Sequence, residues 1–207
     1  MKKDKKTLNI VAILDKSASM SSAINHTVNS FNEFINSQKN SLKHKTNVRV
    51  SLILFDHNYK EVYIDKPLSE VKTLTTEEYV DTGMGMTALF DAIGKTINAI
   101  KGNNTIVFIE TDGEENSSAE FTGDVVKNLI SSKKVMGWEF IFVGSDLSKS
   151  DTINMAKTFG ITPDKVMNIS KTSIGYNTRA TAFSAATMSY ADTGIVGDVS
   201  QAGDIKQ

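Results

Sequence analysis

The stretch Leu8-Asn9-Ile10-Val11-Ala12-Ile13-Leu14-Asp15-Lys16-Ser17-Ala18-Ser19 decides the fold that we predict for this chain. It is an apolar run that ends abruptly at a carboxylate and continues into small polar residues. Such a run is typical of a central parallel strand that is covered on both faces, because neither side of the strand then meets water. We therefore expect a buried strand over 8–14 and a polar loop directly beyond its carboxyl end.

Strands and helices are expected to alternate along the rest of the chain. The expected strands cover 48–55, 61–64, 105–109, 138–143 and 166–169, and the expected helices cover 22–37, 88–100, about 119–133, about 150–158 and around 174–187. Asp56-His57-Asn58 is typical of a turn, and Pro67 ends the strand 61–64, so that strand is expected to be an antiparallel edge strand. The pattern predicts an α/β fold: a doubly wound, mostly parallel sheet with one antiparallel edge strand and helices on both faces.

The composition indicates one soluble globular domain. The chain has 207 residues, of which 40% are hydrophobic and 23% are charged, and it contains no Cys. Lys and Arg number 23 against 24 Asp and Glu, so no excess of positive charge indicates a nucleic-acid partner. We expect a domain over 7–190 and a polar C-terminal tail over 191–207 that is weakly patterned and is either disordered or lies loosely on the surface.

The beginning of the chain resembles a signal peptide only superficially. Four Lys residues lie within 2–6, but the apolar run after them is short, and Asp15 stands where a small-residue cleavage site should follow. No later stretch reaches the roughly 20 apolar residues that span a bilayer. The expectation is a cytoplasmic protein that has no membrane partner.

Residues with oxygen-bearing side chains stand just beyond the ends of two predicted strands and in one glycine-rich loop. Asp15, Ser17 and Ser19 follow the first strand, Asp112 follows the strand 105–109, and Thr87 closes the loop 82–87 before a helix. In open α/β sheets, ligands bind outside the carboxyl ends of strands, where the strand order reverses. We expect these two strands to be neighbours there, so that Asp15 and Asp112 face one another.

The side-chain types of this set select the ligand. Two carboxylates and three hydroxyls, without His or Cys, suit a hard divalent cation: Mg²⁺, with Mn²⁺ and Ca²⁺ as the alternatives. Two negative charges leave a dication close to neutral in total. A cation whose charge is balanced by only two carboxylates can still accept an anionic oxygen from outside.

At these residues the sequence resembles the von Willebrand factor type A family and its metal-ion-dependent adhesion site. The matching motifs are Asp15-x-Ser17-x-Ser19-Met20, Gly85-Met86-Thr87-Ala88-Leu89-Phe90-Asp91-Ala92 and Thr111-Asp112-Gly113, within a resemblance that runs from roughly residue 7 to 187. The resemblance implies that Ser17, Ser19 and Thr87 coordinate the metal directly or nearly so, that Asp15 and Asp112 act partly through water, and that an Asp or Glu of a partner completes the shell. Ala18 and Ala88 depart from a frequent Gly and a frequent Pro, but both are small.

Other interpretations of the motifs are weaker. Ser17 and Ser19 are also good helix caps, and one of them is expected both to cap the helix and to coordinate the metal. Gly94-Lys95-Thr96 looks like the end of a phosphate-binding loop, but Leu89 stands where that loop requires its first glycine. The three His residues show no metal-ligand spacing.

The leading functional hypothesis is a metal-dependent protein-binding module, for adhesion or complex assembly, that is not an enzyme. A protein partner would present an Asp or Glu to the metal. The surroundings expected to rim that contact are Lys16, Met20, Met84, Met86, Glu114 and Glu115, although packing beneath the loop is favoured for the two Met residues of the glycine-rich loop. The alternatives are a metal-dependent hydrolase or phosphoryl-transfer enzyme, and a helper subunit of an ATPase complex.

Overall fold

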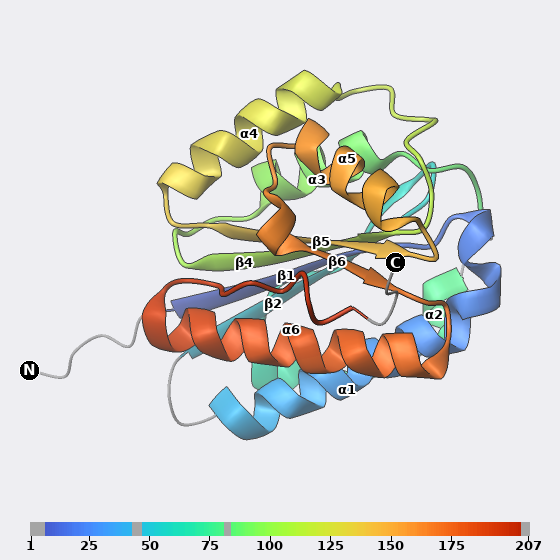
Figure 1. Cartoon of the computed structure of the whole chain (residues 1–207). Coiled ribbons are helices and arrows are strands. Elements are labelled where there is room, and N and C mark those ends of the chain that lie inside the picture. Colours follow the sequence, from blue (N-terminus) through green and yellow to red (C-terminus); the bar gives the residue numbers. More distant parts are fainter. Residues whose placement is uncertain (1–6, 43–46, 81–83, 204–207) are drawn as a thin grey trace, which may run out of the picture.

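A six-stranded sheet forms the centre of the computed structural model, which describes residues 7–42, 47–80 and 84–203 (Figure 1). The strands are β1 (Thr7–Asp15), β2 (Asn47–Phe55), β3 (Tyr59–Pro67), β4 (Thr105–Thr111), β5 (Glu139–Ser145) and β6 (Val166–Ile169). Their order is β3-β2-β1-β4-β5-β6; β3 is antiparallel to β2, and every other pair is parallel. The predicted fold class is confirmed.

Helices cover both faces of the sheet. One face carries α1 (Ile24–Leu42) and α6 (Ser173–Thr193), with the short α2 (Thr76–Val80) beside α1. The other carries α3 (Leu89–Ala99), α4 (Gly123–Val135) and α5 (Lys149–Thr158) (Figure 1). Three short 3-10 helices complete the described elements: η1 (Ala18–Ala23), η2 (Leu68–Glu70) and η3 (Pro163–Lys165).

The apolar run of β1 is explained by two cores, one on each face of the sheet. Side chains alternate across a strand. Ile10 and Leu14 pack into the core beneath α1 and α6, whereas Val11 and Ile13 pack into the core beneath α3 and α4. All four are buried, as expected for a parallel strand with helices on both sides.

Several element boundaries differ from the sequence-based expectation. The first helical segment, expected over 22–37, consists of η1 followed by an α1 that continues to Leu42. The edge strand is longer than 61–64. The helix expected from about 119 begins at Gly123, because the carboxylate of Asp91 accepts hydrogen bonds from the backbone N–H groups of residues 119–121 and holds them in an extended loop. Residues 1–6, and residues 82 and 83 of the expected glycine-rich loop, lie outside the described residues.

The segment after α6 packs on the domain as far as it is described. Val196 and Val199 are buried in the core beneath α6, and the Val199 amide donates to the carbonyl of Asp164. A Cβ atom at Gly203 would collide with the carbonyl of Asn168 in β6. The expectation of a loosely lying tail is therefore wrong for 194–203. Two well-placed valines carry the packing, and they are too few to produce a periodic pattern in the sequence.

Replacing Val196 by Ser is expected to lower the free energy of unfolding by about 1.5–3 kcal/mol, because it removes a fully buried aliphatic side chain. The adjacent Ile195 is 63% exposed and provides a matched control, whose replacement by Ser is expected to change stability by less than about 0.5 kcal/mol. Urea unfolding measures both. Equal effects of the two substitutions would show that the segment does lie loosely.

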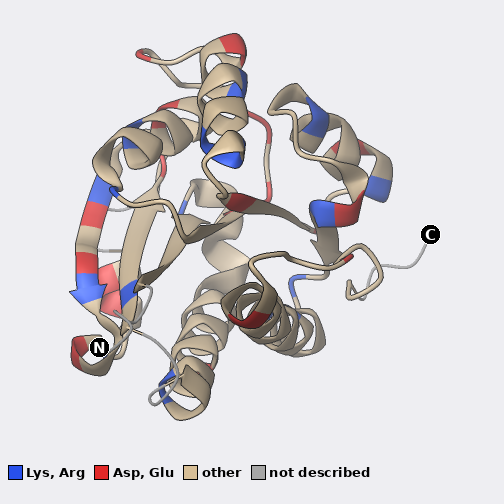
Figure 2. Cartoon of the chain, turned by 90° about the vertical axis from the view of Figure 1, so that its left-hand side faces the viewer, with Lys and Arg blue, Asp and Glu red and all other residues tan. Residues whose placement is uncertain are grey.

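The edge strand β3 carries charges of both signs, from Lys60 and Glu61 to Asp65 and Lys66 (Figure 2). Arg49 of β2 forms a bidentate ion pair with Asp65 at 3.0 Å. Charged side chains on an edge strand oppose pairing with a foreign strand. None of the helices in the described part of the chain has the length and apolar character needed to cross a membrane.

Candidate metal centre

The predicted residues gather beyond the carboxyl ends of β1 and β4, two parallel neighbours at the centre of the sheet. Asp15 is the last residue of β1, and Asp112 directly follows β4. The chain runs from β1 outward to β2 on one side, and returns to β4 on the other. The strand order reverses at this point, so the expected placement of the two carboxylates at the switch point is confirmed.

The Asp15 carboxylate is fully buried and held at both oxygens. Oδ1 accepts the backbone N–H of Ser17 at 2.7 Å, and Oδ2 accepts the hydroxyl of Thr111 at 2.6 Å. The Asp15 carbonyl also accepts the hydroxyl of Tyr79 from α2. Thr111, which belongs to the Thr111-Asp112-Gly113 motif but was given no role of its own there, thus links the ends of β1 and β4 beneath the site.

Burial raises the pKa of Asp15 from its ordinary 3.8 to about 6. Hydrogen bonds from Ser17 and Thr111 lower the pKa and offset part of this rise, while the nearby charge of Asp112 adds to it. The ionised carboxylate is therefore costly in the folded chain at neutral pH. A cation bound between the two carboxylates would remove this cost, which is the first observation that a metal fits here.

In the presence of chelator, Asp15→Asn is expected to stabilise the fold at pH 7.5 by up to about 3 kcal/mol, which is the free-energy equivalent of raising the pKa from 3.8 to about 6. Between these values Asp15 binds a proton in the folded chain that it releases in the unfolded chain, so the contribution of Asp15 to the stability of the wild type falls as pH rises from about 4 to about 6. The asparagine removes this dependence. Urea unfolding at pH 4 and 7.5 measures it, and a destabilised Asp15→Asn variant at pH 7.5 would contradict the prediction.

Ser17, Ser19 and Asp112 form a continuous line of oxygen atoms. The Ser17 and Ser19 Oγ atoms lie 3.1 Å apart, and the Ser19 hydroxyl donates to Asp112 Oδ1 at 2.6 Å. Ser17 occupies the N-cap position of η1, but its side chain makes no capping hydrogen bond. The expectation that one of the two serines also caps the helix is not met at Ser17, whose hydroxyl instead faces Ser19.

Thr87 enters from the loop before α3. Its backbone N–H donates to the Asn116 side chain at 2.9 Å, and its carbonyl accepts the Asn116 N–H at 3.0 Å. The place of a Cβ at Gly113 would be 3.8 Å from both the Thr87 Oγ1 and the Ser19 Oγ, so these hydroxyls flank the same glycine. The loop is also tied to η1, because the Ala18 N–H donates to the carbonyl of Gly85.

Two residues expected at the rim lie inside the protein instead. Lys16 is 1% exposed and forms an ion pair with Asp56 at 3.6 Å at the end of β2. Met20 is fully buried in the core beneath α1. The cause is the alternation of side chains beyond β1: Lys16 points away from the site because Asp15 and Ser17 point into it.

Of the four remaining rim candidates, two lie at the surface and two have structural roles. Met84 packs partly buried against the core, as expected, but Met86 is 59% exposed, so the expectation of packing is wrong for it. Glu114 is exposed. Glu115 accepts hydrogen bonds from the backbone of residues 90, 117 and 118 and therefore fixes the loop after β4.

The structure brings all five predicted ligands together, and their chemistry fits a hard divalent cation. In the part of the chain that is described, no three His, Cys, Asp or Glu side chains cluster as a metal site. The five predicted ligands are two carboxylates and three hydroxyls, a combination that favours Mg²⁺, Mn²⁺ or Ca²⁺ over softer ions. The ligand role of Asp15, Ser17, Ser19, Thr87 and Asp112 remains a prediction.

A cation of the chain itself also reaches this site. The Lys171 Nζ lies 2.5 Å from Asp112 Oδ2 and 3.1 Å from the carbonyl oxygen of Ser19. Lys171 belongs to the turn between β6 and α6 and matches no motif, so no local sequence pattern indicates its place at the site.

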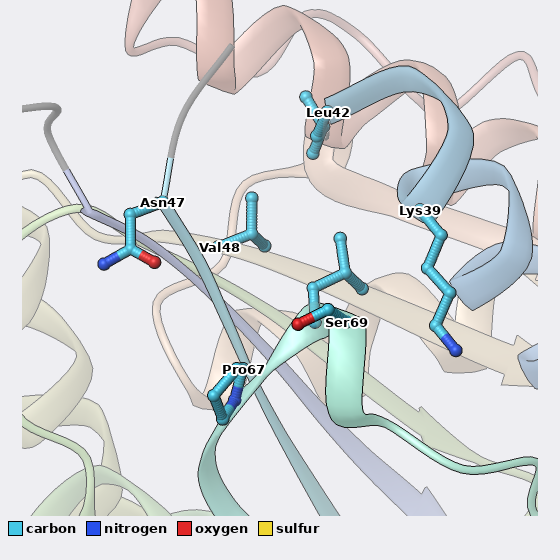
Figure 3. A pocket seen from close by; sticks show the side chains of 7 residues that line it. Lys39, Leu42, Asn47, Val48, Pro67 and Ser69 are labelled. Atoms are coloured by element: carbon cyan, nitrogen blue, oxygen red, sulfur yellow. The ribbon is translucent and has the colours of Figure 1, made fainter. Parts of the chain in front are cut away.

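A separate pocket of about 430 Å³ lies at the opposite end of the sheet, between the end of α1 and the beginning of β2 (Figure 3). It is lined by Lys39, Leu42, Asn47, Val48, Pro67, Leu68 and Ser69. None of these residues is acidic, and the Lys39 amine donates to the carbonyl of Val71. Neither Asp15 nor Asp112 lines this pocket.

The chain has the von Willebrand factor type A fold. The von Willebrand factor domain of the type V pili tip protein Mfa5 from Porphyromonas gingivalis aligns with a TM-score of 0.68 at 11% identity, over 95% of this chain and 99% of that one. The open form of the pilus adhesin SpaC from Lactobacillus rhamnosus GG gives 0.65 at 14% identity, over 88% and 30%. At such identities the likeness establishes the fold, and this chain corresponds to less than a third of SpaC.

A third solved structure has the same fold and contains a metal of its own. Proximal thread matrix protein 1 from the mussel byssus, solved with a zinc-occupied metal-ion-dependent adhesion site, aligns with a TM-score of 0.61 at 16% identity, over 87% of this chain and 48% of that one. These three proteins are adhesion or structural proteins. No protein-family model and no curated protein matches the sequence.

Proposed function

We propose that this domain is a metal-dependent protein-binding module, used for adhesion or complex assembly, and not an enzyme. A divalent cation, Mg²⁺ in the first place, would be held by Asp15, Ser17, Ser19, Thr87 and Asp112 and would supply an electrophilic contact for an Asp or Glu of a protein partner. The observation that carries the proposal is the gathering of three hydroxyls around two buried carboxylates at the switch point of the sheet.

The chain's own residues make this site rigid. Asp15 is fixed by Ser17 and Thr111, and the backbone of Thr87 is clamped on both sides by Asn116. Because these groups are oriented before any ligand arrives, little conformational entropy is lost on binding. Met86 and Glu114, both exposed beside the ligands, are the side chains that would contact the partner and contribute to specificity.

The test is selection from a random-peptide display library in Mg²⁺, followed by elution with chelator. We expect the eluted peptides to contain an Asp or Glu whose replacement by Asn or Gln abolishes binding. Thr87→Ala is expected to weaken binding at least about tenfold, since it removes a hydroxyl aimed at the cation, and Thr87→Ser is expected to retain part of the affinity. Fluorescence anisotropy of a labelled peptide measures both. Peptides that bind equally well in chelator would show that recognition does not use the metal.

The geometry gives less support to the enzymatic alternative. A phosphoryl-transfer nucleophile at Asp15 would have to contact a phosphate group from outside, but the Asp15 side chain is fully buried. The position two residues later, where such an enzyme usually has an acid, is Ser17. A role as helper subunit of an ATPase complex is compatible with the same carboxylate-binding site and is a special case of the proposal.

A further inference from the structure

An ammonium group from the chain itself neutralises one of the two site carboxylates. The Lys171 Nζ lies 2.5 Å from Asp112 Oδ2, and the Asp112 side chain is completely buried. The same amine donates to the backbone carbonyl of Ser19 at 3.1 Å. Lys171 therefore contacts two of the five proposed ligand residues, and it does so from a different element of the fold.

The turn that carries Lys171 is anchored, so its side chain is held within reach of the site. The Lys171 backbone N–H donates to the Asp146 carboxylate at 2.9 Å, and the Asp146 N–H donates to the carbonyl of Ile169 at 2.8 Å. On the other side, Thr172 caps α6 by accepting the N–H of Gly175. The Lys171 side chain itself is only 14% exposed.

A divalent cation and this ammonium compete for the same charge. Asp112 Oδ1 already accepts the Ser19 hydroxyl, and Oδ2 is paired with Lys171, so a cation approaching Asp112 meets a positive charge in contact with its ligand. Repulsion between a dication and an ammonium at contact distance is twice that between two unit charges, and the buried surroundings screen it poorly.

We propose that Lys171 is a tethered competitor of the divalent cation. Its ammonium neutralises Asp112 in the metal-free domain and is displaced from this carboxylate when the cation binds, which sets the metal affinity lower than the five ligands alone would give. The inference rests on the proposed function, because it requires that the five residues bind a metal. The inference goes beyond the proposed function because it names the residue that opposes metal binding.

The experiment is calorimetric titration of MnCl₂ into the whole chain, comparing the wild type with Lys171→Met, which keeps most of the length of the side chain and removes its charge. We expect the Kd of Lys171→Met to be at least about tenfold lower, as the loss of one adjacent positive charge implies. Lys171→Arg keeps the charge and is expected to bind about as weakly as the wild type. Lys101→Met, an exposed lysine before the amino end of β4, is the matched control and is expected to show no change.

Melting temperatures separate competition from a purely structural role. In chelator, Lys171→Met is expected to melt below the wild type, because Asp112 loses its counter-charge. In saturating Mn²⁺ the difference is expected to vanish or reverse. A structural lysine would lower the melting temperature equally in both conditions, and this result would overturn the proposal.

The possible titration results also distinguish the two proposals. Mn²⁺ binding by the Lys171→Met variant but not by the wild type would support the competitor role. Equal or weaker Mn²⁺ binding by Lys171→Met, with measurable binding by the wild type, would overturn the competitor role and leave the proposed function standing. No binding by any variant would overturn both.

Discussion

Replacing Arg179 by Met is expected to lower the free energy of unfolding by about 3–5 kcal/mol, because it leaves the buried carboxylate of Glu110 without its counter-charge. Arg179 of α6 and Glu110 of β4 form an ion pair and are 1% and 0% exposed. The guanidinium also donates to the Ser30 hydroxyl at 3.1 Å and to the carbonyl of Thr27 at 3.0 Å. Burial lowers the pKa of Arg179 to about 9, which leaves it charged at neutral pH.

The two arginines of the chain provide a matched comparison for this measurement. Arg49 pairs with Asp65 at the surface, where the side chains are 29% and 63% exposed, and Arg49→Met is expected to cost less than about 1 kcal/mol. The double variant Arg179→Met/Glu110→Leu is expected to recover most of the loss, since no buried charge is then left unpaired. Urea unfolding measures all three. A cost of less than about 1 kcal/mol for Arg179→Met alone would contradict the argument.

Mn²⁺ at 100 times its Kd is expected to raise the free energy of unfolding by about 2.7 kcal/mol, because the ion binds the folded state and the five ligands are separated in the unfolded chain. Asp15→Asn and Asp112→Asn are each expected to abolish this increment, since each removes half of the negative charge of the site. The increment, measured as the difference between Mn²⁺ and chelator, is the relevant quantity, because Asp15→Asn also shifts the metal-free baseline.

Asp124→Asn makes the same chemical change at an exposed position in the first turn of α4, away from the site, and is expected to keep the whole increment. His57 is less suitable as a control, because its ring lies where a Cβ at Gly85 would be, against the loop that ends at Thr87. Equal increments in the wild type and both site variants would show that the metal, if it binds, binds elsewhere.

The sequence was sufficient to predict the fold and the gathering of the five side chains at one end of the sheet, because both depend on short-range patterns. A strand buried on both faces needs a run like that of β1, and a ligand site at the switch point needs polar residues at adjacent strand ends, as at Asp15 and Asp112. Each signal can be read within a few residues.

The features that could not be predicted depend on contacts between distant segments. Lys171 reaches Asp112 from the turn before α6, and Lys16, which alternation beyond β1 directs away from the site, finds its counter-charge in Asp56 at the end of β2. The late start of α4 follows from the capture of residues 119–121 by Asp91. In each case one side chain meets a partner more than 25 positions away, and no local periodicity records the encounter.

The two edge strands of the sheet determine whether molecules at high concentration can pair strand to strand. One edge strand, β3, carries Lys60 and Glu61 near its beginning and Asp65 and Lys66 near its end, and the other, β6, is only four residues long and is contacted at Asn168 by Gly203. Neither edge strand offers a long, uncharged row of backbone donors and acceptors to a neighbouring molecule. Copies of the domain at high concentration should therefore stay separate instead of joining into a continuous sheet or a fibre.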